Sequence, residues 1–493
     1  MEIKTTMLVY KRSEFLCLNL LIAVAALSMG ACSVGPDYKR PAVNAPASFR
    51  GVSPAEEPGP VSAPAASNPA ASGSPSTGSL GDEKWWEVFE DKELQELIRT
   101  ALKNNYDARI AATRVLEAQA QLGITRADQL PSLSVGANVT GVQNPQVGPI
   151  PGYQLTQGQV SASAAWNLDF WGRYRRATEA ARANLLGSEW AQKEVMSTLV
   201  ANVASSYFLL RQLDYQLEIS QRTLSSRRDS LELTKTLEQH GINNLLDVRQ
   251  SEQLVYTAAA EVPDLERQIT IEENALSILL GNNPGDIPRG LKLTEQPHSP
   301  EVPAGLPSAL LERRPDIREA EQNLIAANAQ IGVARAAYFP QISLTGSAGY
   351  QSSKLTDLFQ GPAGVWSLVG SITQPIFEGG RLKSGVRLAE AQHDQLLLTY
   401  QQAIQGAFRD VSDALVAYRK YREFRIQQQL LVESARDAAR LSELRFKAGS
   451  TDYLEVLTNE TNAFSAELTL AQAQGNELNA LVQLYLALGG GWQ

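Results

Sequence analysis

Two acidic residues at helical spacing are the strongest candidates for chemistry in this sequence. Asp410 and Asp413 stand three residues apart in the run Phe408-Arg-Asp-Val-Ser-Asp-Ala414, so on a helix they would share one face. In a symmetric assembly each carboxylate becomes a ring, and such rings select cations in pores. The alternative is a solvated outer face, with Arg409 and Arg419 as available ion-pair partners. We favour the first interpretation, with both carboxylates in a channel.

Other reactive side chains form no catalytic arrangement. The three histidines are isolated and lack metal-ligand spacing: they are His240, His298 and His393. The charged run Glu312-Arg-Arg-Pro-Asp316 has no nucleophile or base beside it; we expect it to begin a solvated helix, with Pro315 in the first turn. Glycines 489–491 lack the strand and helix of a phosphate-binding loop. The sequence therefore predicts no enzyme, no metal site and no dissociable cofactor.

The two aspartates lie in one of two very long helical runs. Arg175 to His240 and Lys383 to Ala448 contain no proline. At 1.5 Å per residue, each run would be roughly 100 Å long, which is typical of coiled-coil-like assemblies. A further helix is expected from Glu83 to about Gln129, where apolar residues recur at helical spacing.

The second half of the chain repeats the first. The run that begins at Gln121 returns at Gln330, an offset of 209 residues, and the run that begins at Gly241 returns at Gly449, an offset of 208. We infer two tandem repeats, residues 83–290 and 300–493. Each repeat is a helix, a β-hairpin, a long helix, a tight turn and a return helix. By the offset, Asp410 and Asp413 correspond to Asn202 and Ser205 in the first repeat.

Four segments alternate between apolar and polar residues. In the first, Leu133, Val135, Ala137 and Val139 alternate with Ser132, Ser134, Asn138 and Thr140; the others cover 159–170, 342–351 and 366–373. This pattern is typical of a membrane barrel wall, although a soluble sandwich alternates equally well. The loops within the two hairpins are expected at Gly141–Tyr153 and Ser352–Gly364.

Four strands cannot close a barrel, because small membrane barrels need about eight. An open strand edge is not tolerated in lipid. The chain must therefore share a barrel with copies of itself. Two copies would reach the minimum with little lumen, whereas three would give about twelve strands and a pore; we favour three.

The turns that follow the long helices are candidate docking sites. Gly241 and Gly449 suit left-handed helix caps, and Asn244 and Asp452 each precede an acidic residue by three positions, as helix N-caps do. These turns lie at the far ends of the long helices from the hairpins. The expected contact residues for a partner are Gly241, Asn243, Gly449 and Thr451.

The N-terminus is a targeting segment. Lys11 and Arg12 precede an apolar run, Phe15 to Leu27, that is too short for an ordinary membrane span. The following residues, up to Cys32, resemble the lipobox of bacterial lipoproteins. The match implies a signal peptide at 1–31 and an N-acyl diacylglycerol lipid on Cys32; the alternative is an ordinary secretory signal. Residues 32–82, rich in Pro, Ala, Ser and Gly, are expected to form a tether.

Charge and cysteine content exclude several other classes. The net charge of −9 disfavours nucleic acid and anionic membrane surfaces as partners. The only cysteines are Cys17, inside the signal peptide, and Cys32. The mature chain is therefore expected to have no disulfide and no thiolate metal site.

The order of these motifs resembles one family. The lipobox, tether and repeats occur together with Leu168-Asp-Phe-Trp-Gly-Arg173, Glu301-Val-Pro-Ala-Gly-Leu-Pro-Ser308, Glu312-Arg-Arg-Pro-Asp-Ile317 and Ala487-Leu-Gly-Gly-Gly-Trp492. Together they resemble the TolC-like outer-membrane efflux factor family, in its lipoprotein branch typified by OprM and NodT. The resemblance covers residues 32 to 493.

The resemblance implies an α+β membrane protein. Three chains would form a twelve-stranded outer-membrane β-barrel continued by a long periplasmic α-helical barrel. The homotrimer would be a passive exit duct for drugs or other small molecules in a Gram-negative bacterium. Its partners would be a periplasmic adaptor (membrane fusion) protein and an inner-membrane RND-type transporter. The family closes the periplasmic end of the duct with acidic and polar residues; the corresponding candidates are Asp410, Asp413, Tyr400, Asn202 and Ser205.

Two other functions fit part of the pattern. The exit duct of a type I protein-secretion system would have the same fold and a different partner. A structural lipoprotein that spans the periplasm without conduction would need the long helices, but it would not need strands with a polar face.

Overall fold

The computed structural model describes residues 33–43, 46, 49–50, 79–146, 148–297 and 307–492. The signal peptide, Cys32 and most of the tether lie outside these residues. Contacts divide the chain into two units. One, here called the sheet unit, takes its described residues from 1–42, 114–188 and 320–400; the other, the helical unit, takes them from 43–113, 189–319 and 401–493.

Two long helices follow the two hairpins, as predicted. Helix α5 spans Arg173–Gln239 and α9 spans Arg381–Lys447, and each has 67 residues. The return helices α6 (Leu245–Leu279) and α10 (Tyr453–Ala487) have 35 residues each. None of the described helices is both long and apolar enough to cross a lipid bilayer.

The expected single helix from Glu83 to Gln129 is wrong. The structure has three helices there: α2 (Trp85–Val88), α3 (Lys92–Asn104) and α4 (Tyr106–Ala127). The side chain of Asp91 accepts hydrogen bonds from the backbone N–H groups of Glu93 and Leu94, and Asn105 accepts one from Ala108. Such side chains compete with continued helix and start a new one.

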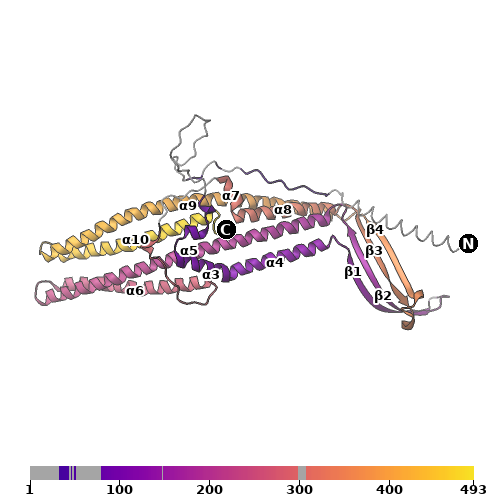
Figure 1. The fold of residues 1–493 in the computed structure, drawn as a ribbon, viewed down its shortest axis with the longest axis horizontal. Helices are drawn as coiled ribbons and strands as arrows, with labels where there is room; N and C mark the ends of the chain where they lie inside the picture. The colour runs from indigo at the N-terminus through magenta and orange to yellow at the C-terminus, as the bar shows by residue number, and fades with distance from the viewer. Residues whose placement is uncertain are drawn as a thin grey trace, which may run out of the picture. The chain divides into compact units, whose positions relative to one another are not determined.

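The four strands form one antiparallel sheet in the order β1-β2-β3-β4 (Figure 1). The strands are β1 (Ser132–Asn144), β2 (Tyr153–Leu168), β3 (Gln341–Ser352) and β4 (Gly364–Thr373). Because β1 and β2 pair as far as Asn144 and Tyr153, the first hairpin loop is shorter than predicted. The central pair, β2 and β3, joins the two hairpins.

The register keeps polar and apolar rows separate across all four strands. One row is Ser134, Ser163, Ser347 and Ser367. The adjacent row, which faces the other side, is Val135, Ala162, Ala348 and Trp366. Hydroxyl pairs in the serine row are 2.8 Å apart on β1–β2 and on β3–β4. The predicted alternation is confirmed, with one polar and one apolar face.

The chain itself leaves the apolar face of this sheet uncovered. Trp366 is 81% exposed, Leu133 77% and Ile372 72%. The strands at the two edges, β1 and β4, each pair on one side only within the described sheet. The sheet therefore has apolar surface and backbone groups that a single chain does not satisfy.

Glycines end both long helices with the predicted left-handed backbone. The φ angle is 73° at Gly241 and 70° at Gly449. After α5, the Ile242 N–H bonds to the Leu237 carbonyl, as in a Schellman cap. Asn244 then caps α6 in a reciprocal pair with Asp247. Asp452 occupies the N-cap position of α10, as predicted, but its side chain makes no capping bond; instead, the Thr451 hydroxyl bonds to the Glu455 carboxylate.

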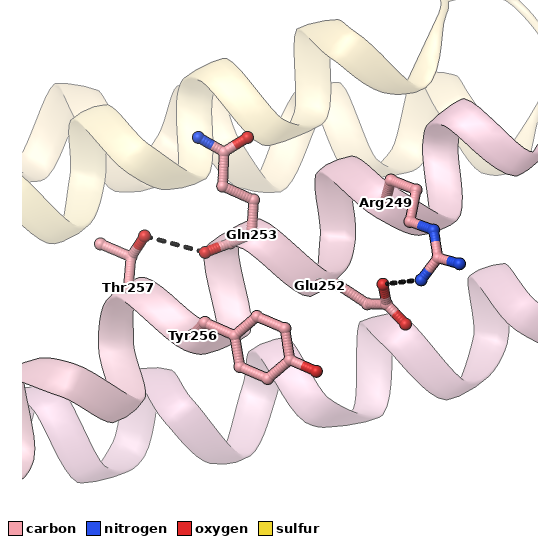
Figure 2. A pocket seen from close by; sticks show the side chains of 5 residues that line it. All are labelled: Arg249, Glu252, Gln253, Tyr256 and Thr257. Atoms are coloured by element: carbon pink, nitrogen blue, oxygen red, sulfur yellow. Dashed lines mark hydrogen bonds and ion pairs between the residues drawn. The ribbon is translucent and has the colours of Figure 1, made fainter.

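A shallow hollow lies on an exposed face of the first turns of α6 (Figure 2). Its lining residues are Arg249, Glu252, Gln253, Tyr256 and Thr257. The Arg249 guanidinium lies 2.6 Å from the Glu252 carboxylate, and the Thr257 hydroxyl donates to the Gln253 carbonyl at 2.8 Å. Tyr256 is 67% exposed. These contacts are local to one helix face.

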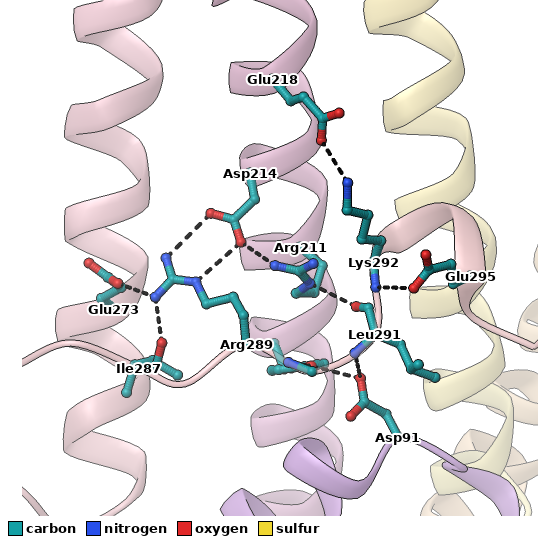
Figure 3. Close-up of polar contacts among 12 residues, drawn as sticks. Asp91, Arg211, Asp214, Glu218, Glu273, Ile287, Arg289, Leu291, Lys292 and Glu295 are labelled. Atoms are coloured by element: carbon teal, nitrogen blue, oxygen red, sulfur yellow. Dashed lines mark hydrogen bonds and ion pairs between the residues drawn. The ribbon is translucent and has the colours of Figure 1, made fainter.

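A buried polar network holds the segment after α6 against α3 and α5 (Figure 3). Asp91 is 2% exposed. Its carboxylate accepts hydrogen bonds from the Tyr207 hydroxyl at 2.7 Å and the Leu291 N–H at 2.9 Å. Arg289 pairs with Asp214 of α5 and Glu273 of α6. Burial and the Asp91 carboxylate both raise the pKa of Tyr207, so the phenol stays a donor.

We expect Asp91→Ala to destabilise the helical unit by about 3 kcal/mol or more, because it leaves several buried donors without an acceptor. The exposed cap is the matched control: Asn244→Ala should lose only about 1 kcal/mol. Chemical denaturation of the solubilised protein, followed by far-ultraviolet circular dichroism, measures both. Equal losses of unfolding free energy in the two variants would show that the Asp91 network stabilises the helical unit no more than the exposed cap does.

Candidate functional site

The two predicted aspartates line one pocket of the helical unit, here called the acidic pocket. Its volume is about 620 Å³. Four stretches of chain line it: Glu194, Ser197 and Thr198 of α5; Arg314, Pro315 and Asp316 where α7 (Pro307–Arg313) meets α8 (Pro315–Ala336); Arg409, Asp410, Asp413, Ala414 and Ala417 of α9; and Gln483, Leu486, Ala487 and Gly489 at the end of α10. Residues far apart in sequence therefore meet here.

Asp410 is held by two arginines. Its carboxylate lies 2.7 Å from Arg409 and 3.3 Å from Arg314. The Arg314 side chain is only 13% exposed and also pairs with Asp316 at 2.7 Å. Burial acts to lower the pKa of Arg314, but hydrogen bonds and charge from Asp316 and Asp410 outweigh it and raise the pKa. Arg314 is therefore a fixed cation that neutralises part of the predicted acidic pair.

Sequence reasoning missed this role of Arg314. The proline at 315 begins α8, as expected, but the expectation of a solvated helix start is wrong at Arg314. Its partner Asp410 is 96 residues away, so no local spacing reveals the pair. The run Glu312-Arg-Arg-Pro-Asp316 was a visible signal of dense charge, although the sequence did not indicate what the charges contact.

Asp413 differs from Asp410 in its surroundings. It is exposed, and it makes no hydrogen bond or ion pair with another described residue. Its counterpart Asn202 on α5 is also exposed. These two side chains, one on each long helix, are accessible to a channel lumen or to a ligand.

The other two gate candidates are less accessible. Tyr400 is 0% exposed, so within the chain its side chain presents no surface to a channel. Ser205 is half-buried, and its hydroxyl oxygen is buried without a hydrogen-bond partner among the described residues. Both side chains belong to helix packing.

The position of the aspartates along α9 follows from the bounds of that helix. Asp410 lies 37 residues before the end of the helix at Lys447 (447 − 410). At 1.5 Å per residue this is roughly 55 Å of helix. The pair therefore lies near the middle of α9, and its place near the periplasmic end of the duct stays a prediction.

Glu194 is an unpredicted titratable group in the acidic pocket. Burial, and next the charges of Asp316 and Glu319, raise its pKa to about 7, against a lowering effect of Arg314. A hydrogen bond with Glu319 acts in the same direction, because two carboxyl groups can bond only when one keeps its proton. Glu194 meets these groups only through the tertiary fold, so the sequence carried no signal for it.

The predicted docking residues lie in the turns between the long and return helices. Gly241 and Gly449 are exposed, and Asn243 and Thr451 are half-buried. Among the described residues, no group of three or more His, Cys, Asp or Glu is placed to hold a metal ion.

The segment after the predicted lipid site is fixed to the sheet unit. The Val34 N–H bonds to the Trp171 carbonyl at 3.1 Å. Further along, Asp37 pairs with the buried Arg176 at 2.7 Å and Arg40 pairs with Glu321 at 2.9 Å. Residues 33–40 are therefore held beside the start of α5.

Comparison with known proteins shows similarity over nearly the whole chain. A family model described as outer membrane efflux protein matches residues 97–282 and 306–490. The probable efflux pump outer membrane protein TtgC of Pseudomonas putida is 37% identical over 96% of this chain and 95% of its own length. The cation efflux system protein CusC of Escherichia coli is 35% identical over 96% and 99%. Among solved structures, the open state of the MtrE outer membrane channel of Neisseria gonorrhoeae is similar, with a TM-score of 0.81 and 32% identity over 94% of this chain and 99% of that one.

Glu194→Gln tests the protonation of the acidic pocket. The pKa of Glu194 is raised from 4.5 to about 7, so the folded chain binds more protons than the unfolded chain between these values, and stability falls as pH rises through that window. The Gln variant stays neutral, so its thermal unfolding midpoint should rise relative to that of wild type as pH increases from 5 to 8.5. Glu117→Gln, at an exposed position on α4, is the control. A constant difference between Glu194→Gln and wild type across this pH range would contradict the assignment.

Proposed function

The chain belongs to the outer membrane efflux protein family, and we propose that three copies form a passive exit duct of a tripartite efflux system. It is the outer-membrane channel component of an efflux pump, as its family indicates. The observation that carries the trimer proposal is the four-stranded sheet. Its polar and apolar rows alternate in register, and its two edges lack partners within the chain.

The strand count supports the proposed trimer. Lipid offers no hydrogen bonds, so the edges of β1 and β4 need strands from other copies. Three copies give about twelve strands, enough for a water-filled lumen. The serine row would then face water and the row of Val135 and Trp366 would face lipid. The long helices would continue the barrel into the periplasm.

The cargo is proposed as small molecules. TtgC and related proteins of antibiotic, solvent and toluene pumps are 37–38% identical to this chain, and CusC proteins of cation efflux systems are 35–36% identical. A passive duct need not recognise what passes. The proposed partners are a periplasmic adaptor and an inner-membrane RND-type transporter, which would select the cargo.

Lipid on Cys32 is proposed as an additional anchor. Residues 33–40 are bound to the sheet unit through Asp37–Arg176 and Arg40–Glu321, so a lipid one residue earlier would be held close to the strands that enter the membrane. Incorporation of labelled palmitate, present in wild type and absent in Cys32→Ser, checks this; equal labelling would refute it.

The turns at Gly241 and Gly449 are proposed as the adaptor contact. They present free helix N–H groups and the positive ends of α6 and α10 to a partner. Asn243→Cys and Thr451→Cys should cross-link to the adaptor in cells with a short bifunctional reagent. Gln146→Cys, in the first hairpin loop, is the control. Cross-linking from the hairpin loop alone would reverse the proposed topology.

Asp413 is proposed to line the conducting path, with Asn202 on α5 and the arginine-paired Asp410 beside it on α9. A ring of Asp413 carboxylates favours cations. In planar bilayers, Asp413→Asn should lower the cation-to-anion permeability ratio of the channel. Tyr400→Phe, at a fully buried position, should leave the ratio unchanged. An unaltered ratio in an assembled Asp413→Asn channel would place this residue away from the path, and the absence of any channel in wild type would refute the duct itself.

A further inference from the structure

We propose that copies of the chain join each other in the strand register that joins the two hairpins within one chain. In that register Gly370 of β4 lies opposite Val139 of β1 in the neighbouring copy. The inference rests on the proposed trimer and adds which residues meet at its interface. All the contacts that support it lie within the sheet unit.

The two hairpins have matching registers. Ser132 pairs with Ala165 in the first hairpin, and Gln341 pairs with Thr373 in the second. The first strands of the hairpins are therefore related by 209 residues (341 − 132), and the second strands by 208 (373 − 165). The same offsets relate the repeated sequence motifs. Each residue of one hairpin thus has a defined counterpart in the other.

The joint between the two hairpins supplies the template. There β2 pairs with β3, and Ala162 lies opposite Ala348. The counterpart of Ala162 on β4 is Gly370 (162 + 208), and the counterpart of Ala348 on β1 is Val139 (348 − 209). These two strands, β4 and β1, are the edges of the described sheet. The edge of one copy therefore corresponds to the edge of the next as β2 corresponds to β3.

The proposed register also keeps the two faces of the sheet separate. It brings Ile372 opposite Ala137 on the apolar face and Ser371 opposite Asn138 on the polar face. A shift by one residue would mix the faces. A shift by two residues would keep the faces but make the joint between copies unlike the joint within each chain. Because strand tilt and stagger are linked in a barrel, equal joints give a regular wall.

The segment after β4 lacks a contact that the segment after β2 makes. The Trp171 ring, after β2, stacks on Phe339 with centroids 4.8 Å apart, and its indole N–H donates to the Pro340 carbonyl at 2.8 Å. After β4, Ile376 is 90% exposed and Phe377 is 87% exposed. The chain therefore leaves this second apolar segment uncovered.

The repeat indicates what covers that segment. The counterparts of Phe339 and Pro340 are Leu130 and Pro131, just before β1, and Leu130 is 66% exposed. In the proposed register these residues of the neighbouring copy lie beside the segment after β4. Gly379 stands at the position of Trp171, so the apolar side chains available for the contact are those of Ile376 and Phe377.

A glycine in α4 provides an independent observation. Within the chain, α5 packs on α8 through a cluster of buried alanines. A Cβ added to Gly332 of α8 would lie 2.9 Å from Cγ of Arg176 on α5, so this close approach requires glycine. The counterpart Gly123 of α4 has no described atom of the chain within 4 Å of an added Cβ. Glycine weakens a helix interior, and α9 of a neighbouring copy would account for it here.

Paired cysteines test the register in membranes that contain the full-length protein. Gly370→Cys is combined in turn with Ala137→Cys, Val139→Cys or Gly141→Cys, three positions on the same face of β1. Directly opposed Cα atoms are about 5 Å apart, within the reach of a disulfide. A shift of two residues moves the partner by about 7 Å along the strand. After mild oxidation, the Val139 pair should give several-fold more dimer and trimer on non-reducing gels than either flanking pair.

The outcomes separate the register from the trimer. Strongest cross-linking by a flanking pair, or equal cross-linking by all three, would overturn the proposed register and leave the trimer intact. Monomer bands alone from all three pairs, in protein that is correctly inserted, would overturn the trimer and the register together.

A second pair of variants tests the helix contact without any change in the strands. Gly123→Leu should lower the temperature at which the detergent-solubilised trimer dissociates, measured by light scattering, because the larger side chain would meet α9 of the neighbouring copy. Gln121→Leu is the matched control: its counterpart Gln330 on α8 is exposed, so the dissociation temperature should stay that of wild type. Equal temperatures for both variants and wild type would refute the contact at Gly123, and with it the correspondence between the two kinds of joint.

Discussion

The outer edges of β1 and β4 carry backbone N–H and C=O groups that the chain itself does not pair. In water these groups would be solvated, whereas in hydrocarbon each unpaired group costs several kcal/mol. The row of exposed apolar side chains on the same sheet, including Trp366 and Leu133, favours lipid over water. In the proposed trimer, copies of the chain pair edge to edge, and both demands are then met together.

In the proposed trimer, neighbouring copies would cover the long helices as well as the sheet. The sequence continues from β2 into α5 within five residues, and β4 is followed closely by α9, so each copy that adds a pair of hairpins also adds two helices of 67 residues. These helices leave large apolar side chains exposed, such as Leu398 at 66% and Leu430 at 53%. Neighbouring copies would cover such positions. The polar networks around Asp91 and Arg314 instead operate within one chain, where they fix the connecting segments.

Features with a local cause were predictable from the sequence. The alternation around Ser134 and Val135 gave the strand faces, the absence of proline indicated α5 and α9, and Gly241 and Gly449 marked the turns. The break of the first predicted helix at Asp91 was missed because the helical spacing of apolar residues continues past this capping residue. Pairs such as Arg314 with Asp410, or Glu194 with Asp316, could not be found, because tertiary packing alone brings them together. The burial of Tyr400 was missed for the same reason.

Disulfide trapping between β1 and β4 tests the shared barrel most directly. Within one sheet these edges are three strand spacings apart, about 14 Å, beyond the reach of a disulfide. Ala137→Cys on β1, combined in turn with Leu368→Cys, Gly370→Cys or Ile372→Cys on β4, can therefore link only different chains. The account predicts that at least one pair in membranes gives dimer and trimer bands, and none larger, on non-reducing denaturing gels. Monomer bands alone from all three pairs, in protein that is correctly inserted, would contradict it.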